Sequence, residues 1–363
     1  MSFIKRIGFL SAFLITALFF IGMKAGGGYT YMGFLFAFFV LPALDLLVGK
    51  DSENVDEGSV SEESKKFYYR FITYLWAYIQ VFVVIFSCYQ VTQLNYNLFE
   101  WTGFILSLGT MTGGIGITVA HELGHKNTKI EQFYSKVLLM TVSYMHFFVE
   151  HNRGHHVHVA TPKDPATAKY GESFYRFWPR TVFGSYFSAW KIENKRLRKK
   201  GLSPFSISNS MIWYTILPFV FCAALTTLFS FLSGTFQWAI PILFFSQSFV
   251  AITLLELVNY IEHYGITREE IEPGKYERVK PIHSWNANHL VSNFFLFQLQ
   301  RHSDHHAFAN RRYQVLRHWE ESPQLPASYP TMIILALFPP LWFRVMNKKL
   351  DSWKEKYYSQ KVA

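Results

Sequence analysis

Three short stretches of the sequence contain eight of its 14 histidines. The stretches HELGH, EHNRGHH and QRHSDHH are rich in imidazole, which in its neutral form binds zinc, copper, iron and nickel. One metal ion accepts at most about six ligands, so eight histidines exceed the needs of a single ion. The pattern therefore predicts a site for two metal ions, with these ligands: His121, His125, His151, His155, His156, His302, His305 and His306.

The spacing of these histidines predicts how they share the metal ions. Residues three or four apart lie on one face of a helix. We therefore expect three face pairs: His121 with His125, His151 with His155, and His302 with His305. The doublets 155–156 and 305–306 each add a ring about 100° around the helix, an offset that suits a second ion beside the first.

Several acidic residues lie beside these histidines. A carboxylate that accepts the far ring N–H of a ligand histidine fixes its tautomer and aims the other nitrogen at the metal. An ionisable side chain within an apolar segment also usually marks function. The residues expected to orient ligands or shape the pocket are Glu122, Glu150, Glu256, Glu262, Asp304 and His289.

The stretch HELGH also fits the H-E-x-x-H pattern of zinc proteases, in which Glu122 would be the general base. Such an enzyme needs one further ligand and has no use for two histidine doublets. A metal transporter, another alternative, would need ligands along a path across a membrane. The clustered histidines favour a two-metal enzyme over both alternatives.

The composition predicts an all-α protein embedded in a membrane. Half of the 363 residues are apolar and only 17% are charged, against about 25% in soluble domains. A helix needs about 20 apolar residues to cross a bilayer. The expected spans are 7–23, 28–48, 69–91, 100–120, 211–233 and 237–260.

We expect a single domain, 1–363, whose catalytic segments are 121–210 and 261–345. The first apolar run could be a cleaved signal peptide, but its length and the second run that follows favour a retained helix. Two further apolar stretches are interrupted: 133–149 by Lys136 and His146, and 329–345 by two prolines. The first of these is expected to lie along the membrane face or dip into it.

The basic residues predict the orientation, because Lys and Arg accumulate on the cytoplasmic side. Of the 35 Lys and Arg residues, Lys24 alone falls in the loops 24–27, 92–99 and 234–236. Those loops are therefore external, and both termini and all three histidine clusters are cytoplasmic. The net charge of +10 reflects this topology and attraction to anionic lipids, and no motif indicates nucleic-acid binding.

Longer blocks around the histidines resemble the integral-membrane alkane 1-monooxygenases. The resemblance covers residues 30–345 and rests on HELGHK, FFVEHNRGHHVHVATPKDPATA, NYIEHYG, SWNANHLVSN and LQRHSDHHAFANRRYQVLR. It implies a non-haem di-iron centre, O2 as co-substrate, and a linear alkane from the bilayer that is hydroxylated at its terminal carbon. It also implies a ninth ligand, His263, in NYIEHYG.

The same resemblance implies a bacterial inner membrane and electrons delivered by rubredoxin from an NAD(P)H-dependent rubredoxin reductase. The sequence has two cysteines, Cys88 and Cys222, so we expect a separate rubredoxin. An acidic carrier is expected to dock on basic side chains such as Arg311, Arg312 and the run 195–200. Xylene hydroxylases, fatty-acid hydroxylases and desaturases share the three histidine clusters and are the related alternative.

Overall fold

Six long apolar helices form the body of the protein in a computed structural model that describes residues 3–362. Within that range, the helices able to cross a membrane are Phe3–Ala25, Gly27–Val48, Phe67–Gln90, Leu98–Gly124, Ser210–Ser233 and Ala239–His263. Each of the six predicted spans coincides with one of these helices. The fourth and sixth extend farther than expected, so His121 and His263 belong to the ends of spans and not to the segments that follow.

Several spans change helical type along their length. The first combines α1 (Phe3–Gly8), η1 (Phe9–Phe13) and α2 (Leu14–Ala25); the second, η2 (Gly27–Tyr31), α3 (Met32–Leu35), η3 (Phe36–Val40) and α4 (Leu41–Val48). The third is α6 (Phe67–Gln90); the fourth combines α7 (Leu98–Thr110), η4 (Met111–Ile117) and α8 (Thr118–Gly124). The fifth and sixth are α13 (Ser210–Ser233) and α14 (Ala239–His263).

The other elements connect the spans at one end of the bundle. Those before α13 are α5 (Glu57–Lys65), α9 (Lys129–Met140), α10 (Phe147–Glu150), η5 (His151–His155), α11 (His156–His158) and α12 (Phe174–Arg198). Those after α14 are the hairpin β1 (Glu270–Glu272) and β2 (Lys275–Tyr276), η6 (Pro281–His283), α15 (Leu290–Phe295), α16 (His302–Ala307), η7 (Tyr313–Val315), α17 (Tyr329–Ala336) and α18 (Pro339–Val362).

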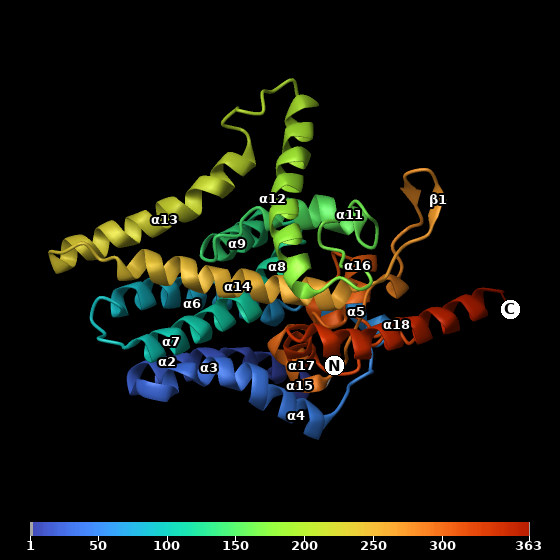
Figure 1. Ribbon diagram of the computed structural model, residues 1–363, viewed down its shortest axis with the longest axis horizontal. Helices are drawn as coiled ribbons and strands as arrows, with labels where there is room; N and C mark the ends of the chain where they lie inside the picture. Colours follow the sequence, from blue (N-terminus) through green and yellow to red (C-terminus); the bar gives the residue numbers. More distant parts are fainter. Residues whose placement is uncertain (1–2, 363) are drawn as a thin grey trace.

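Figure 1 shows how this arrangement gathers the histidine segments. The spans run roughly parallel in the view, and α8, α11 and α16 lie toward the end of the bundle where both chain ends are also found. The long helix α12 stands across the direction of the spans and packs against α10, α13 and α14. Segments far apart in the sequence therefore meet at one end of the bundle.

Three stretches are π-helical: η3 in the second span, η4 in the fourth, and η5 at the second histidine cluster. A π-helix bonds residue i to residue i+5, so its turn is wider than an α-turn, and such stretches are frequent at functional sites. Each therefore shifts the face on which the following side chains lie.

The apolar stretch 133–149 is not a span. Helix α9 ends at Met140, and the turn that follows it enters the bundle. There Thr141 accepts a hydrogen bond from Gln80 of α6 (2.9 Å) on its hydroxyl and one from Gln247 of α14 (2.8 Å) on its carbonyl. These bonds satisfy polar groups that the surrounding apolar residues cannot pair.

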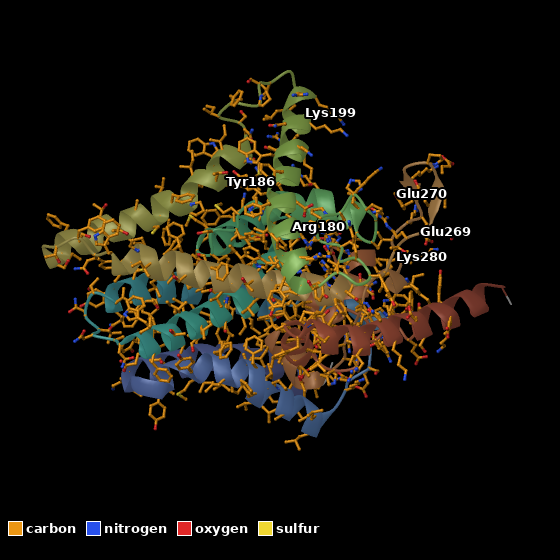
Figure 2. All side chains as sticks on the ribbon, viewed as in Figure 1. Arg180, Tyr186, Lys199, Glu269, Glu270 and Lys280 are labelled. Carbon is orange, nitrogen blue, oxygen red and sulfur yellow. The ribbon has the colours of Figure 1, made fainter. Side chains whose placement is uncertain are left out.

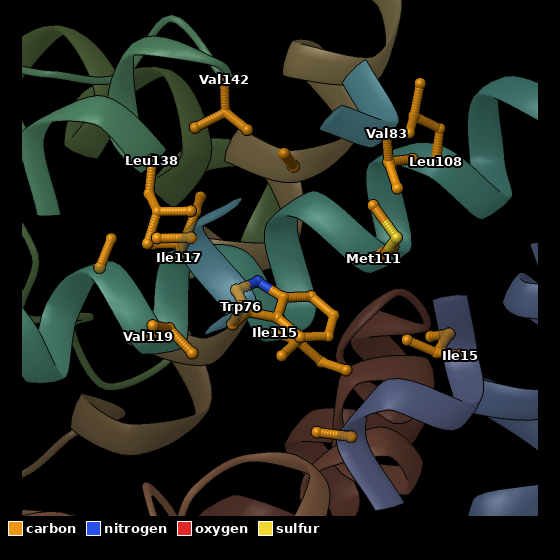
Figure 3. Packing of buried hydrophobic residues seen from close by; sticks show 14 of the residues in the cluster. Ile15, Trp76, Val83, Leu108, Met111, Ile115, Ile117, Val119, Leu138 and Val142 are labelled. Atoms are coloured by element: carbon orange, nitrogen blue, oxygen red, sulfur yellow. The ribbon is translucent and has the colours of Figure 1, made fainter. Parts of the chain in front are cut away.

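The interior of the bundle is packed around Trp76 of α6. In Figure 3 its ring lies against Ile115 of η4, within a cluster that also contains Ile15 and Met111. Its indole N–H donates to Gln80 (3.0 Å), so the buried ring leaves no unpaired donor. The fourth span approaches α14 closely because Gly113 has no side chain: a Cβ there would lie 2.6 Å from the Cα of Ala251. Small residues commonly allow such contacts between membrane helices.

We predict that Gly113→Ala lowers the stability of the bundle while Gly114→Ala does not. The Gly113 methyl group would meet the Ala251 backbone, whereas a Cβ on Gly114 has nothing within 4 Å. Overpacking of this kind costs about 1–3 kcal/mol. Thermal unfolding of the two detergent-solubilised variants measures the difference. Equal melting temperatures would show that the fourth span and α14 can move apart without loss of stability.

Candidate metal centre

Nine buried or half-buried histidines converge in two groups. The first contains His121, His125, His151, His156 and His305, and the second contains His155, His263, His302 and His306. In each group every histidine offers one ring nitrogen, and these nitrogens lie within 4.8 Å of one another. The nine are those predicted as ligands, including His263, to which only the resemblance pointed.

In the five-histidine group, the Nε2 atom of His156 lies 3.1 Å from the Nε2 of His151 and 3.1 Å from the Nε2 of His305. The rings of His121 and His125 pack against this trio, with centroids 4.4 Å and 4.5 Å from His151 and His156, respectively. Their Nε2 atoms are buried and have no hydrogen-bond partner. All five rings thus present Nε2 to the group or leave it unpaired.

In the four-histidine group, the Nε2 atom of His302 lies 3.2 Å from the Nε2 of His263 and 2.9 Å from the Nε2 of His306. The ring of His155 completes this group, with its centroid 4.7 Å from that of His263. Its Nε2 is also buried without a partner. The second group therefore has the same chemistry as the first with one ring fewer.

The two doublets divide between the groups, as the spacing predicted, but two of the three expected face pairs are wrong. His151 and His155 fall in different groups, as do His302 and His305. The reason at the second cluster is η5, whose wide π-turn brings His151 beside His156, five residues on. In α16 the pair is His302 with His306, four residues on.

Burial favours the neutral form of five of these imidazoles. Loss of solvent, followed by repulsion from neighbouring histidines, lowers the pKa well below the usual 6.5 for His151, His156, His302, His305 and His306. The neutral ring is the form that binds a metal ion. No protons have to be displaced from these rings at neutral pH before they can bind.

The donor set fits metal ions. Each neutral ring has one N–H, and three Nε2 atoms at 2.9–3.2 Å cannot all be satisfied by hydrogen bonds to one another. Buried lone pairs without a partner are costly, and a cation between them removes that cost. Three buried Nε2 atoms in the two groups lack a hydrogen-bond partner: those of His121, His125 and His155.

Asp164 orients one of these rings and was missed by the sequence reasoning. Its carboxylate lies 2.9 Å from the Nδ1 of His155 and accepts a hydrogen bond from the Thr167 hydroxyl (2.6 Å). An N–H on Nδ1 leaves Nε2 free to bind metal. Asp164 follows His155 by nine residues in the block TPKDPAT, so only its resemblance to a known block could have indicated it.

Two of the residues expected to orient ligands, Glu122 and Asp304, have other partners. Glu122 pairs with Lys126 (3.0 Å) and accepts from the backbone N–H of Tyr313 (3.3 Å). Asp304 pairs with Arg311 and accepts from the Trp319 indole (2.8 Å). These carboxylates were expected at the ring nitrogens because they adjoin histidines in sequence, but neighbours on a helix point in different directions.

Glu256 and His289 also lie away from the nine rings. Glu256 accepts from Tyr144 (2.8 Å), Thr181 (2.9 Å) and Asn259 (3.1 Å), so it ties α14 to the 141–146 turn and to α12. His289 precedes α15, and its Nδ1 has no hydrogen-bond partner. Neither contact supports the expected role at a ligand.

Glu150 and Glu262 are closer to the expectation. Glu150 is buried with one unpaired oxygen, and burial followed by repulsion from Asp164 raises its pKa well above the usual 4.5. Glu262 meets a clustered histidine directly, with Oε2 3.1 Å from the Nε2 of His302.

Ion pairs and hydrogen bonds connect the segments that carry the histidines. Arg311, which follows α16, pairs with Asp304 of that helix. Arg312 pairs with buried Glu131 of α9 (2.8 Å). The Lys126 ammonium donates to the Arg311 carbonyl (2.8 Å), which joins the end of the fourth span to the segment after α16. Burial lowers the pKa of Lys126, and the Glu122 carboxylate opposes that effect. These contacts fix two histidine segments relative to each other.

An apolar cavity runs from the interior of the bundle to the histidines. It is bordered by the first, second, fourth and sixth spans, by α17 and by residues 295–299. Both π-helical stretches within the spans line it. Its polar residues are few: Thr110, Thr118, Asn259, Glu262, Tyr329, and the histidines His121, His151 and His302. The cavity thus reaches members of both histidine groups.

Comparison with known proteins agrees with this architecture. The family model described as "Fatty acid desaturase" matches residues 99–336, which include all nine clustered histidines. The fold and site therefore define a membrane protein of the fatty acid desaturase class.

Among curated proteins, "Alkane 1-monooxygenase 2" of Alcanivorax borkumensis is 44% identical, covering 93% of this chain and 87% of its own. "Alkane 1-monooxygenase 2" of Pseudomonas aeruginosa is 45% identical over 87% of this chain and 82% of its own. A xylene/toluene monooxygenase hydroxylase component of Pseudomonas putida is 28% identical over 95% and 89%. The chain belongs to the alkane 1-monooxygenase family.

We predict that Asp164→Asn weakens metal binding by about 10–100-fold, the usual cost of removing a group that orients a ligand histidine. Glu122→Gln should leave metal binding nearly unchanged, because its carboxylate meets Lys126 and a backbone N–H. Metal retained per chain during titration with a chelator measures both. Equal losses in the two variants would contradict the assigned role of Asp164.

Proposed function

We propose that this protein hydroxylates linear alkanes at the terminal carbon, using O2, at a centre of two iron ions held by the nine histidines. The observation that carries the proposal is the apolar cavity that leads through the spans to His121, His151 and His302. Alkanes dissolve in the bilayer, so such a cavity admits the substrate and presents one end of it to the histidines.

The chemistry explains why a metal is needed. A terminal C–H bond is strong and unpolarised, so acid–base side chains cannot cleave it, and bound redox iron would supply the activation of O2. The overall reaction consumes an alkane, O2, two electrons and two protons and releases a 1-alkanol and water. Histidines alone suit several metals, and the family is the reason for choosing iron.

The chain itself positions the substrate. The apolar lining excludes water from the reacting end and packs along the alkyl chain, as in most small-molecule sites. Phe36 and Phe38 of η3 and Ile115 of η4 supply much of this surface. Because three imidazoles line the cavity beside its apolar residues, a linear chain that enters end-on would present its terminal carbon to them.

We further propose that the protein is a single domain in the bacterial inner membrane with its histidine end and both termini in the cytoplasm. The distribution of Lys and Arg supports this orientation. Helix α12 presents exposed aromatic side chains, Tyr175, Phe183 and Phe187, and carries basic residues in its last turn. Such a helix suits the headgroup region of an anionic leaflet.

The electron donor in this proposal is a separate rubredoxin, reduced by an NAD(P)H-dependent reductase. Of the basic groups expected to receive it, Arg311 and Arg312 lie next to α16 but hold buried carboxylates. The run 195–200 ends α12: Figure 2 shows Lys199 at its far end and Arg180 in its lower half. The 19 residue steps from Arg180 to Lys199 cover about 28 Å at about 1.5 Å per residue. We place docking beside α16, at Arg311 and Arg317, which both donate hydrogen bonds to Asp304 of that helix.

We predict that the purified protein contains about two irons per chain and, with rubredoxin, reductase, NADH and O2, converts an alkane to the 1-alkanol. Each of His121→Ala, His155→Ala and His305→Ala should abolish turnover, because each removes a nitrogen from one of the two groups. A panel of alkanes, fatty acids and methyl-arenes identifies the substrate class. Full activity in any of these variants, or a preference for methyl-arenes, would overturn the corresponding part of the proposal.

We predict that Arg317→Glu raises the KM for rubredoxin several-fold and reduces the dependence of turnover on salt. Arg317 is partly exposed, its guanidinium pairs with the exposed carboxylate of Glu57, and its backbone N–H bonds Asp304. Lys199→Glu is the matched control, an exposed charge on the distal end of α12. An unchanged KM for Arg317→Glu, or an equal change in the control, would move the docking site elsewhere.

A further inference from the structure

The two histidine groups are unequal, and a carboxylate lies at the smaller one. The first group has five rings and the second has four. We propose that Glu262 supplies an oxygen ligand to the metal ion of the four-histidine group, an inference that rests on the proposed two-metal centre. Each metal position would then have five protein ligands, and the two would differ in charge.

The position of Glu262 is the first argument. Its Oε2 lies 3.1 Å from the Nε2 of His302. That same nitrogen lies 3.2 Å from the Nε2 of His263 and 2.9 Å from the Nε2 of His306. The carboxylate oxygen is therefore placed among the nitrogens that converge in this group. It is the last residue of α14 but one, so the helix that carries His263 also delivers it.

The side of the imidazole that it meets is the second argument. A carboxylate that merely orients a ligand histidine bonds the nitrogen opposite the metal, as Asp164 does at the Nδ1 of His155. Glu262 instead meets the Nε2 of His302, on the side where the other rings converge, while the Nδ1 of His302 has no hydrogen-bond partner. This position suits a carboxylate that binds the same metal ion as His302, and not one that orients the His302 ring.

The absence of a counter-charge is the third argument, since the Tyr329 hydroxyl, which also interacts with this carboxylate, is uncharged. Glu262 is 1% exposed, and its Oε1 has no hydrogen-bond partner among the described residues. No Lys or Arg pairs with it in the described part of the chain; the one ion-pair contact is with His302. A buried carboxylate without a counter-charge is strongly destabilising. A metal cation at the four-histidine group would provide that charge.

Glu256 shows what a structural carboxylate on the same helix looks like. It is equally buried, but both of its oxygens accept hydrogen bonds, from Tyr144, Thr181 and Asn259. None of these partners belongs to the two histidine groups. Glu256→Gln is therefore a matched control for a substitution at Glu262.

A carboxylate ligand would make the two metal positions chemically different. Five neutral imidazoles leave the full charge of the cation, whereas an anionic oxygen at the other position neutralises part of it. A hard anionic oxygen favours the more highly charged oxidation state relative to imidazole alone. The proposal therefore expects two distinct iron environments in the same chain.

The test is metal occupancy and the Mössbauer spectrum of the ferrous protein, with Glu262→Gln, Glu262→His and Glu256→Gln compared. We expect two quadrupole doublets in the unaltered protein. In Glu262→Gln one doublet should shift or disappear, with one iron removed by chelator at least about tenfold more readily. Glu262→His, which restores a ligand without restoring the negative charge, should recover the second iron. Glu256→Gln should keep both irons and both doublets.

Two results would overturn the proposal: two unchanged doublets with unchanged iron retention in Glu262→Gln, or failure of Glu262→His to retain iron better than Glu262→Gln. If Glu262→Gln does not yield folded protein, the comparison of Glu262→His with the unaltered protein decides, since a structural carboxylate would not be replaced by imidazole. The readout does not use turnover. A protein that holds two irons in this way and leaves alkanes unreacted would refute the proposed function and leave the ligand assignment intact.

Discussion

The convergence of nine imidazoles inside the protein is the constraint on which the rest of the structure depends. Their lone pairs face one another in two groups, and each group needs a cation to be stable. The rings come from the fourth span, the segment 151–156, the end of α14 and α16, so these elements must be held in register. The ion pairs of Glu131 with Arg312 and of Asp304 with Arg311 serve that purpose. They act on the histidines indirectly, by fixing the backbone that carries them.

Position relative to the membrane follows from the same constraint. The spans provide an apolar interior, and the histidines close it at one end, where polar segments 121–210 and 261–345 gather. In the proposed function, a substrate that dissolves in lipid and a reductant that dissolves in water would meet at that end. Glu256, Gln80 and Gln247 are buried polar residues of the spans, and each is hydrogen-bonded to the 141–146 turn. They attach the polar end to the apolar body without leaving unpaired groups in it.

Residue type and spacing were enough to predict the six long apolar helices, eight of the nine converging histidines and the division of the doublets, whereas His263 came from the resemblance alone. They were not enough to pair His151 with His156, because the prediction assumed α-helical periodicity and η5 is π-helical. Adjacency in sequence also misassigned Glu122 and Asp304, whose side chains point to Lys126 and Arg311. Asp164 was missed for the opposite reason: it reaches His155 through a turn and not through a helical repeat. Tertiary contacts decide such partners, and these contacts cannot be inferred from the spacing of residues in one sequence.

The π-turn of η5 also determines which genetic changes this protein can accept. A π-turn holds one residue more than the α-helical ladder needs. Loss of a single residue between His151 and His155 would let an ordinary α-helix form there, at no cost in helix stability. Yet it would rotate every later side chain by about 100° relative to His151, and His156 would leave its group. We therefore expect chain length in this stretch to be constrained more strictly than the identity of Asn152, which is half-buried, or of Arg153, which is exposed. Point substitutions should accumulate there in evolution, and insertions and deletions should not.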